Sequence, residues 1–504
     1  MNRREFLERA AVVAMPGALA GCLGGGKAGS NTTSRRRTVP VTQPRRPTLR
    51  DLARELHGPL LRPEAHDYAD IRRVYNSRYE NVRPRAVAVA VSEHDVRACV
   101  RWAARSGSPI SIRSGGHSYA GYSTTSGLVC DVRRLRRIAT APSGRTVIVG
   151  AGALLIDVVG ALAARGLAIP AGSCPTVGIG GLALGGGVGL AARAFGTTSD
   201  NVLALRVVTA DGRLVEATPV THPDLYWACR GGGGGNFGAV TALTLGTHPV
   251  GDVAYAFCNW PWSQAAAAVA AWQALAPQAS DQLSLICTLA TDPAGVRVRV
   301  FGQLLDGSES DLRAMLAPLA AVPGATVNVG SASYLDAQRI WAGCAGESEA
   351  VCRAFRPTSF AARSDYVARP LSADAIATMV AFVEQRQPQA PDGVSAMLLD
   401  PYGGAINQVP SDATAFVHRA QLFSCQYLAY WSHPREAGAA KAWLDAFHAA
   451  MRPHVSGQAY QNYIDPSLRN WEQAYYGSNL ARLREVKRAY DPDGLFRFRQ
   501  SIRA

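Results

Sequence analysis

The stretch that decides the fold occupies residues 172–189 and reads Gly-Ser-Cys-Pro-Thr-Val-Gly-Ile-Gly-Gly-Leu-Ala-Leu-Gly-Gly-Gly-Val-Gly. A segment this rich in glycine is not expected to form a helix or strand that is stable by itself. Glycine lets the backbone pass close to a ligand or adopt positive φ angles. The stretch therefore predicts a backbone that wraps a large flat or anionic ligand.

Two further glycine-rich sites flank this stretch in the sequence. The first is Arg113-Ser114-Gly115-Gly116-His117-Ser118-Tyr119, which directly follows a predicted strand. Its two glycines could aim successive N–H groups at one anion, although a tight turn with a surface histidine is the simpler alternative. The second site has five consecutive glycines, 231–235, before Asn236-Phe237-Gly238. Predicted strands lie close on both sides, which argues against a flexible linker.

The segments around these glycines predict an α/β start. A strand at 86–91 is followed by a helix that Ser92 caps, with Asp95 in the capping-box position, and then by a strand at 110–112. Further strands are predicted at 128–132, 146–149 and 240–245, with a helix at 154–165. A hairpin is predicted at 203–217, because Ala210-Asp211-Gly212 is a strong turn signal.

The character of the chain changes near residue 251, where alanine-rich helices such as 263–275 and alternating strands such as 296–303 begin. The last fifty residues are rich in Tyr and Asn and end in a predicted helix, 479–490. We therefore expect an α+β protein with units at 51–250 and 251–455 and a C-terminal segment at 456–504.

The formal charge of +14 is concentrated at the N-terminus, because residues 1–50 carry ten Lys and Arg but two acids. The remaining chain shows no basic stripe interleaved with aromatics, so nucleic acid is not an expected partner. Residues 1–22 resemble a twin-arginine export signal: Arg3-Arg4-Glu5-Phe6-Leu7 precedes a short apolar run. That run ends in Leu19-Ala20-Gly21-Cys22, which predicts either lipidation of Cys22 or ordinary signal cleavage. Residues 23–50 read as a flexible tether.

The ten cysteines include no pair with the spacing of a structural zinc site, and we expect no metal. An export signal permits disulfides. Cys344 and Cys352 lie close together in a polar loop and are the best candidates for one.

Several motifs in order resemble the berberine bridge enzyme family, within the vanillyl-alcohol oxidase superfamily of FAD proteins. Besides the stretches at 113–118 and 174–181, they include Asp200-Asn201-Val202, His222-Pro223-Asp224-Leu225-Tyr226-Trp227 and, near the C-terminus, Tyr475-Tyr476-Gly477-Ser478-Asn479. The resemblance covers roughly residues 51–504. It implies a two-part PCMH-type FAD-binding domain plus an antiparallel-sheet substrate domain with covering helices.

The resemblance implies that FAD is attached by two covalent bonds, one to His117 and one to Cys174. An imidazole and a thiolate are also the side chains best able to add to an electron-poor flavin. The motifs imply a wider set of cofactor-binding positions: Arg113, Ser114, Gly115, Gly116, Ser118, Val177, Gly178, Gly181, Gly185, Gly186, Gly238, Val240 and Asn479.

The resemblance also suggests the catalytic pair. In Tyr460-Gln461-Asn462-Tyr463, Tyr463 matches the family's base, and Asp400 matches the Asp that assists it in the related carbohydrate oxidases. Asp400 could instead merely cap the turn at Pro401. Tyr119 and Gln426 either line the substrate pocket or serve packing.

The leading hypothesis is an exported oxidase that converts an alcohol of a sugar or glycosylated natural product and reduces O₂ to H₂O₂. A dehydrogenase with another electron acceptor, and a catalytically silent lipid-anchored binding protein, are the alternatives. The retained His117, Cys174, Tyr463 and Asp400 argue against a mere binding protein.

Overall fold

The predicted α/β start is present in the computed structural model, which describes residues 45–390 and 393–504. β2 (Ala86–Val89), α4 (Glu93–Ser106) and β3 (Ile110–Arg113) follow one another, and both strands pair in parallel with β4 (Leu128–Asp131). β1 (Leu60–Leu61) completes this sheet as an antiparallel edge.

Ser92 caps α4 as predicted, because its hydroxyl accepts a hydrogen bond from the Asp95 backbone N–H at 3.4 Å. The predicted capping box is wrong. The Asp95 carboxylate instead accepts hydrogen bonds from the backbone N–H groups of His57 and Val91, at 2.7 and 2.8 Å. It therefore anchors a distant segment of the chain to the start of α4.

The second sheet is antiparallel, with the strand order β5-β6-β10-β8-β9. The predicted hairpin is confirmed, because β8 pairs with β9 and Gly212 takes a φ of 80° in the turn. The strands are β5 (Ile138–Thr140), β6 (Thr146–Gly150), β8 (Val202–Val208), β9 (Leu214–Ala217) and β10 (Ala239–Gly246).

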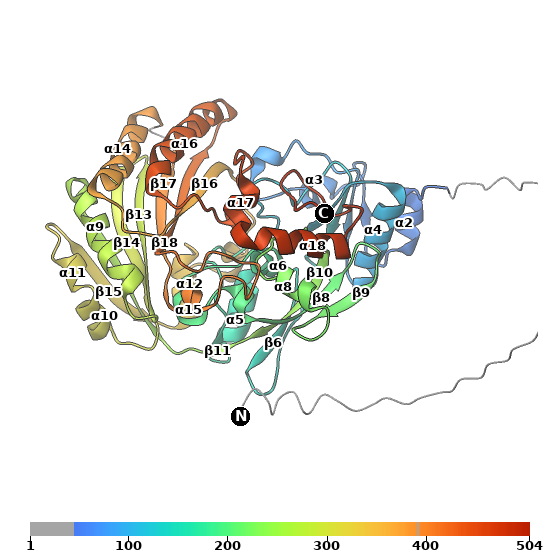
Figure 1. Cartoon of the computed structure of the whole chain (residues 1–504), viewed down its shortest axis with the longest axis horizontal. Coiled ribbons are helices and arrows are strands. Elements are labelled where there is room, and N and C mark those ends of the chain that lie inside the picture. The colour runs from blue at the N-terminus through green and yellow to red at the C-terminus, as the bar shows by residue number, and fades with distance from the viewer. Residues whose placement is uncertain (1–44, 391–392) are drawn as a thin grey trace, which may run out of the picture. The chain divides into compact units, whose positions relative to one another are not determined.

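One hydrophobic core joins these two sheets to α5 (Leu155–Ala163) and to the end of the chain. Tyr475 and Tyr476 of α17 (Trp471–Tyr476) and Leu483 of α18 (Leu480–Tyr490) are buried in it. Figure 1 shows α18, in red, beside the green helix α8 (Pro223–Ala228). The C-terminal segment therefore returns to the part of the fold that carries the glycine-rich loops.

The third large sheet is antiparallel and has seven strands, in the order β15-β12-β14-β13-β17-β18-β16. Side chains alternate along each strand, so Cys425, Tyr427 and Ala429 pack with the helices in a second core. Figure 1 shows α9 (Ala265–Leu275), α14 (Ala373–Gln389) and α16 (Ala437–Met451) beside this sheet. The strands are β12 (Val253–Trp260), β13 (Leu283–Asp292), β14 (Gly295–Leu304), β15 (Thr326–Ala332), β16 (Ser359–Val367), β17 (Ser395–Pro401) and β18 (Phe423–Trp431).

Two short helices lie where none was expected. Residues 48–50, assigned above to the tether, belong instead to the start of α2 (Leu49–Glu55), which Thr48 caps through a capping box. Within the glycine-rich stretch, Ile179–Leu184 forms the helix α6, held by the tertiary contacts of its buried Ile179 and Ala183. The other elements are α3 (Tyr68–Ile71), β7 (Leu167–Ala168), α7 (Ala192–Phe195), β11 (His248–Pro249), α10 (Glu309–Met315), α11 (Ala317–Ala320), α12 (Tyr334–Trp341), α13 (Glu349–Cys352) and α15 (Gly404–Gln408).

Among the described residues, no helix is both long and apolar enough to cross a membrane. The predicted export signal, Cys22 and most of the tether lie outside these residues.

Candidate active site between the glycine-rich loops and the seven-stranded sheet

The loop at 113–118 packs directly against the loop at 174–178. A Cβ atom placed on Gly115 would lie 2.3 Å from the Gly178 nitrogen, and one placed on Gly178 would lie 1.9 Å from the Ser114 hydroxyl oxygen. Neither position could carry a side chain without moving the other loop. Glycine is therefore required because two backbones meet, and this contact brings His117 and Cys174 to one place.

Arg113 fixes the base of the first loop. Its buried guanidinium pairs with the buried Asp131 at 2.7 Å and donates hydrogen bonds to the carbonyls of Ile71 and Arg72. Ser114 donates a hydrogen bond to the Ala151 carbonyl at 2.6 Å. These two predicted cofactor-binding side chains are thus engaged with the protein itself.

His117 is held as a neutral imidazole. Its ring stacks on Tyr75 at 4.0 Å between ring centroids, and its Nε2 lies 2.9 Å from the Thr176 hydroxyl. Burial lowers the pKa of His117 to about 4. If Nε2–H donates to Thr176, Nδ1 carries a free lone pair, which is the form that attacks an electrophile.

Cys174 is a free cysteine that lies close to three tyrosines. Its side chain is exposed to solvent, yet the surrounding protein raises the pKa of its thiol. The charge of a Cys174 thiolate would raise the pKa values of Tyr75, Tyr119 and Tyr430, which places all three close to the sulfur. Cys174 is therefore a thiol at neutral pH, not the thiolate expected from the sequence.

The glycines at 181 and 234 lie beside free space. A Cβ atom on Gly181 would meet no atom within 4 Å, and one on Gly234 would approach none closer than 3.9 Å. Nearby, the Oε1 atom of Gln461 is buried without a hydrogen-bond partner. These features fit a flavin that is held covalently. The His117 imidazole and the Cys174 thiol are nucleophiles, the backbone at Gly181 borders free space, and Gln461 offers an unpaired polar atom.

Other glycines of the predicted cofactor set accommodate protein side chains instead. A Cβ atom on Gly185 would lie 2.0 Å from Asn462 Oδ1, and one on Gly186 would lie 2.8 Å from the Phe416 ring. The glycine-rich stretch thus also packs against the Tyr460–Tyr463 segment, a contact that was not predicted.

Three further positions of that set belong to the protein framework. Gly238 lies against Val207, Val240 is buried in β10, and Asn479 donates hydrogen bonds to the carbonyls of Ser411 and Thr414. The Ser118 hydroxyl accepts a hydrogen bond from the backbone N–H of Tyr122 at 3.1 Å. The backbone N–H of Val177 donates a hydrogen bond to the Cys174 carbonyl.

The second half of the site comes from the seven-stranded sheet and the 3₁₀ turn Gln461–Tyr463. Gln426 of β18 donates a hydrogen bond to the Tyr119 hydroxyl at 2.8 Å, and the Tyr119 ring stacks on Tyr463 at 5.5 Å. Three predicted site residues from distant parts of the sequence are therefore in one cluster, and Tyr119 links it to Cys174.

Asp400 lies inside β17, opposite Ser424, whose hydroxyl donates to its carboxylate at 3.4 Å. β17 ends at Pro401, and the hydrogen bond to the Asp400 carboxylate comes from Ser424 of the neighbouring strand. Burial raises the pKa of Asp400 to about 6. Burial, and then the charge of Asp400, raises the pKa of Tyr463 well above its usual value.

An ion-pair network behind Tyr463 was not predicted. Arg363 of β16 pairs with Asp465 at 2.6 Å and also with Asp445 of α16. Asp465 in turn accepts hydrogen bonds from both the backbone N–H and the hydroxyl of Ser467, and its own N–H donates to Tyr475. This network fixes the segment that follows Tyr463 against the sheet.

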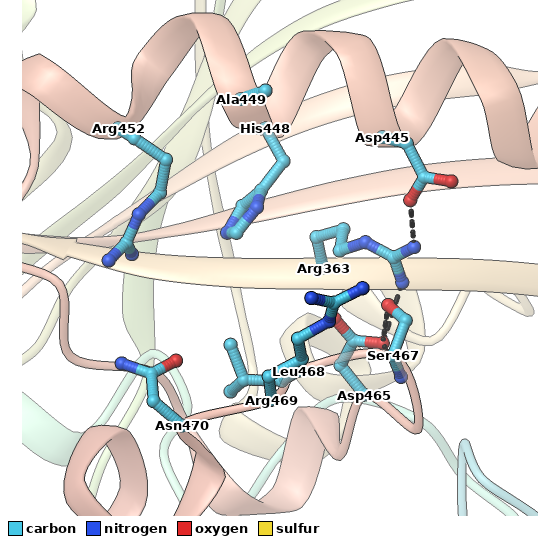
Figure 2. Close-up of a pocket in the computed structure, with 10 residues that line it drawn as sticks. All are labelled: Arg363, Asp445, His448, Ala449, Arg452, Asp465, Ser467, Leu468, Arg469 and Asn470. Carbon is cyan, nitrogen blue, oxygen red and sulfur yellow. Dashed lines mark hydrogen bonds and ion pairs between the residues drawn. The ribbon is translucent and has the colours of Figure 1, made fainter.

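Figure 2 shows that the side chains of this network line a recess. The recess has a volume of about 300 Å³, and neither His117 nor Cys174 is part of its lining. Its lining is Arg363, Asp445, His448, Ala449, Arg452, Asp465, Ser467, Leu468, Arg469 and Asn470. The sequence held no signal for it, because Arg363 is one basic residue in an otherwise ordinary strand.

The predicted disulfide is confirmed: Cys344 and Cys352 are bonded, and they pack against Ile156 of α5. A metal was not expected, but ligand atoms of His57, His94 and Asp95 lie within 4.8 Å of one another. Asp95 already accepts three backbone hydrogen bonds, and the two imidazole rings stack face to face at 4.5 Å between ring centroids.

Comparison with known proteins decides the family. Residues 84–218 match the FAD binding domain model, and residues 459–503 match the berberine and berberine like model. The FAD-linked oxidoreductase YgaK of Bacillus subtilis is 32% identical over 455 residues, which are 89% of this chain and 97% of the relative. The chain belongs to the berberine bridge enzyme-like family of FAD-linked oxidoreductases.

Solved structures of this berberine bridge enzyme-like family have the same fold. The BBE-like 1 protein of Physcomitrella patens matches with a TM-score of 0.84 and 31% identity, over 90% of this chain and 99% of that one. A chitooligosaccharide oxidase matches with a TM-score of 0.80 and 27% identity, over 90% and 98%. FAD is therefore the cofactor, and the expected PCMH-type fold is confirmed.

Proposed function

We propose that this member of the berberine bridge enzyme-like family is an oxidase for an alcohol group of a sugar or glycosylated natural product. It would convert the alcohol to a carbonyl and reduce O₂ to H₂O₂. The observation that carries the proposal is the placement of Asp400, Tyr463, Tyr119 and Gln426 beside the loops of His117 and Cys174. The similarity to a chitooligosaccharide oxidase supports a sugar over other alcohols.

The cofactor would be joined to the Nδ1 of His117 and to the sulfur of Cys174. The neutral His117 ring, held by Tyr75 and Thr176, supports the first bond. The solvent-exposed Cys174 side chain supports the second. FAD, when bound, would accept the hydride of the substrate carbon and deliver the electrons to O₂.

Asp400 and Tyr463 would manage the proton of the substrate hydroxyl. A tyrosine with a strongly raised pKa keeps its own proton at neutral pH and is a poor base. A carboxylate with a pKa of about 6 is ionised there and can accept one. Asp400 would therefore end with the proton, taken either directly or through the Tyr463 hydroxyl.

Gln426 would orient the substrate indirectly. Its amide holds the Tyr119 hydroxyl at 2.8 Å, and the Tyr119 ring backs Tyr463. With these positions fixed, the substrate carbon could face the cofactor while its hydroxyl faces Asp400.

The export predicted from Arg3-Arg4, with or without lipidation of Cys22, is part of the proposal. It is supported by the Cys344–Cys352 disulfide, since such bonds persist in oxidising compartments.

The test is a screen of mono- and oligosaccharides with the purified holoprotein. Sugar added without O₂ should bleach the flavin absorbance, and O₂ added afterwards should restore it with formation of H₂O₂. A sugar that bleaches the flavin but leaves it reduced under O₂ would support the dehydrogenase alternative. If no sugar or other alcohol bleaches it, the proposed activity is wrong.

A further inference from the structure

A second recess lies beside the C-terminal helix α18, and most of its lining is basic. We call it the arginine recess. It has a volume of about 490 Å³, and its lining is Trp471, Glu472, Arg484, Arg488, Arg503 and Ala504. These residues come from α17, from α18 and from the last residues of the sequence. Among the described residues that line the arginine recess, none belongs to the candidate active site.

The arginine recess has an excess of positive charge. Three guanidinium groups share it with one carboxylate, that of Glu472, and a carboxylate at Ala504 would still leave the lining positive. Within the described part of the chain, the guanidinium groups of Arg488 and Arg503 have neither an ion-pair partner nor a hydrogen-bond partner. Arg484 and Arg488 are four residues apart on α18, a spacing at which like charges repel each other. A bound anion would offset this repulsion.

The helix dipole explains only one of these arginines. Arg488 lies in the last turn of α18, where a cation is favourable. Arg484 lies in the first half of the same helix, and Arg503 lies outside it. Their placement in one recess therefore needs another reason, and a ligand of negative charge supplies it.

Arg484 is held in position with donors to spare. Its Nη2 donates hydrogen bonds to both carboxylate oxygens of Glu472, each at 3.0 Å. An arginine has more N–H donors than this pair uses, so the Nη1 and Nε of Arg484 stay available to a ligand. The side chain of Arg484 is 42% exposed, so a ligand can reach it. Because Glu472 already orders the guanidinium, a ligand does not have to do so.

The other sides of the arginine recess are also anchored to the fold. The partly buried ring of Trp471 lies 6.4 Å from the buried ring of Tyr475. Arg503 follows the buried Ile502, whose backbone N–H donates a hydrogen bond to the buried Asn236 at 3.0 Å. The arginine recess is therefore built on packed residues on both sides.

We propose that the arginine recess binds a phosphate group. A planar guanidinium donates two parallel hydrogen bonds to phosphate oxygens and keeps its charge at physiological pH. A phosphate group has enough oxygens to accept hydrogen bonds from several arginines at once. The volume of the arginine recess is in the range of small-molecule sites, which leaves room for the group that carries the phosphate.

This inference does not rest on the proposed function, because the arginine recess and the candidate active site share no described residue. A soluble phosphate ion and the headgroup of an anionic phospholipid present the same chemistry to the arginines. The experiment therefore has one arm for each of these two sources.

Isothermal titration calorimetry of the holoprotein with inorganic phosphate is the first arm. Arg488→Ala and Arg503→Ala should each weaken binding about tenfold or more, because each removes charge-assisted hydrogen bonds. Arg488→Lys keeps the charge but loses the planar fork, so it should keep only part of the affinity. Arg497→Ala is the matched control, since Arg497 is an exposed arginine of the same segment outside the recess. It should bind phosphate as the natural protein does, and flavin content should be the same in all variants.

Co-sedimentation with vesicles is the second arm. Retention on vesicles of equal parts phosphatidylcholine and phosphatidylglycerol, but not on phosphatidylcholine alone, would assign the site to a lipid headgroup if Arg488→Ala removes it. Binding of inorganic phosphate without this difference between vesicles would assign the site to soluble phosphate. The inference is overturned if neither probe binds. It is also overturned if Arg497→Ala weakens binding as much as Arg488→Ala, because the attraction would then come from the overall charge of the segment.

Discussion

Replacing Asp400 tests the proposed proton acceptor. Burial raises its pKa to about 6, so the carboxylate should be protonated below that pH and ionised above it. If it accepts the substrate proton, flavin reduction should be constant above about pH 7 and fall as the pH drops through 6, with about a tenth of the plateau rate left at pH 5. Asp400→Asn, which keeps the size of the side chain, should slow reduction by about 10²–10⁴-fold and abolish this pH dependence.

Two companion variants sharpen this prediction. The Ser424 hydroxyl donates to Asp400 and lowers its pKa, so Ser424→Ala should move the acid limb to higher pH. Tyr463→Phe keeps the ring that stacks on Tyr119 but removes the hydroxyl. If the hydroxyl relays the proton to Asp400, the double variant should be far less than additive.

The assay is anaerobic stopped-flow absorbance with the best substrate of the screen, from pH 5 to pH 9. Reoxidation by O₂, measured separately, should change little, because neither side chain is needed for it in the proposed scheme. The assignment of Asp400 as the base would be refuted if flavin in Asp400→Asn were reduced as fast as in the natural protein. It would also be refuted if the rate in that variant still fell at low pH.

Three further predictions concern attachment and stability. His117→Ala and Cys174→Ala should each retain flavin through the remaining bond after acid denaturation, and the double variant should release it; free flavin from either single variant would contradict two bonds. Removing the disulfide by Cys344→Ser should lower the free energy of unfolding by about 2–3 kcal/mol, measured by denaturant titration, and an unchanged midpoint would show that the bond is unimportant. Arg363→Ala leaves the carboxylate of its buried partner uncompensated and should cost about 3–5 kcal/mol, with faster loss of activity on warming than in Arg363→Lys.

The fold could be predicted where the signals are local. The Ala210-Asp211-Gly212 turn specified its hairpin, and Ser92 specified the start of α4, because both depend on residues a few positions apart. The capping box failed because Asp95 bonds to His57, 38 residues earlier. A propensity argument contains no information about such a distant partner.

In the candidate site, too, residues in short motifs could be predicted, whereas contacts between distant parts of the chain could not. His117 and Cys174 could be predicted as flavin-attachment residues because each lies in a distinctive short motif. The hydrogen bond from Gln426 to Tyr119 spans 307 residues, and the ion pair from Arg363 to Asp465 spans 102. Such contacts depend on how the sheet packs against the glycine-rich loops, and only the folded chain reveals them.

Glycine was interpreted correctly as a sign of close approach, but the approaching group was often misjudged. Gly181 borders free space, as a ligand-facing residue should. Gly185 and Gly186 make room for Asn462 and Phe416. A glycine in the sequence indicates that a side chain is not tolerated at that position, but not whether a ligand or another part of the protein occupies the space.

The central claim is that His117 and Cys174 hold one FAD between them. Mass spectrometry of a denatured, protease-digested holoprotein tests it most directly. The account predicts a single species in which the peptide containing His117 and the peptide containing Cys174 are joined through one flavin. Recovery of both peptides unmodified, with all the flavin free in solution, would contradict it.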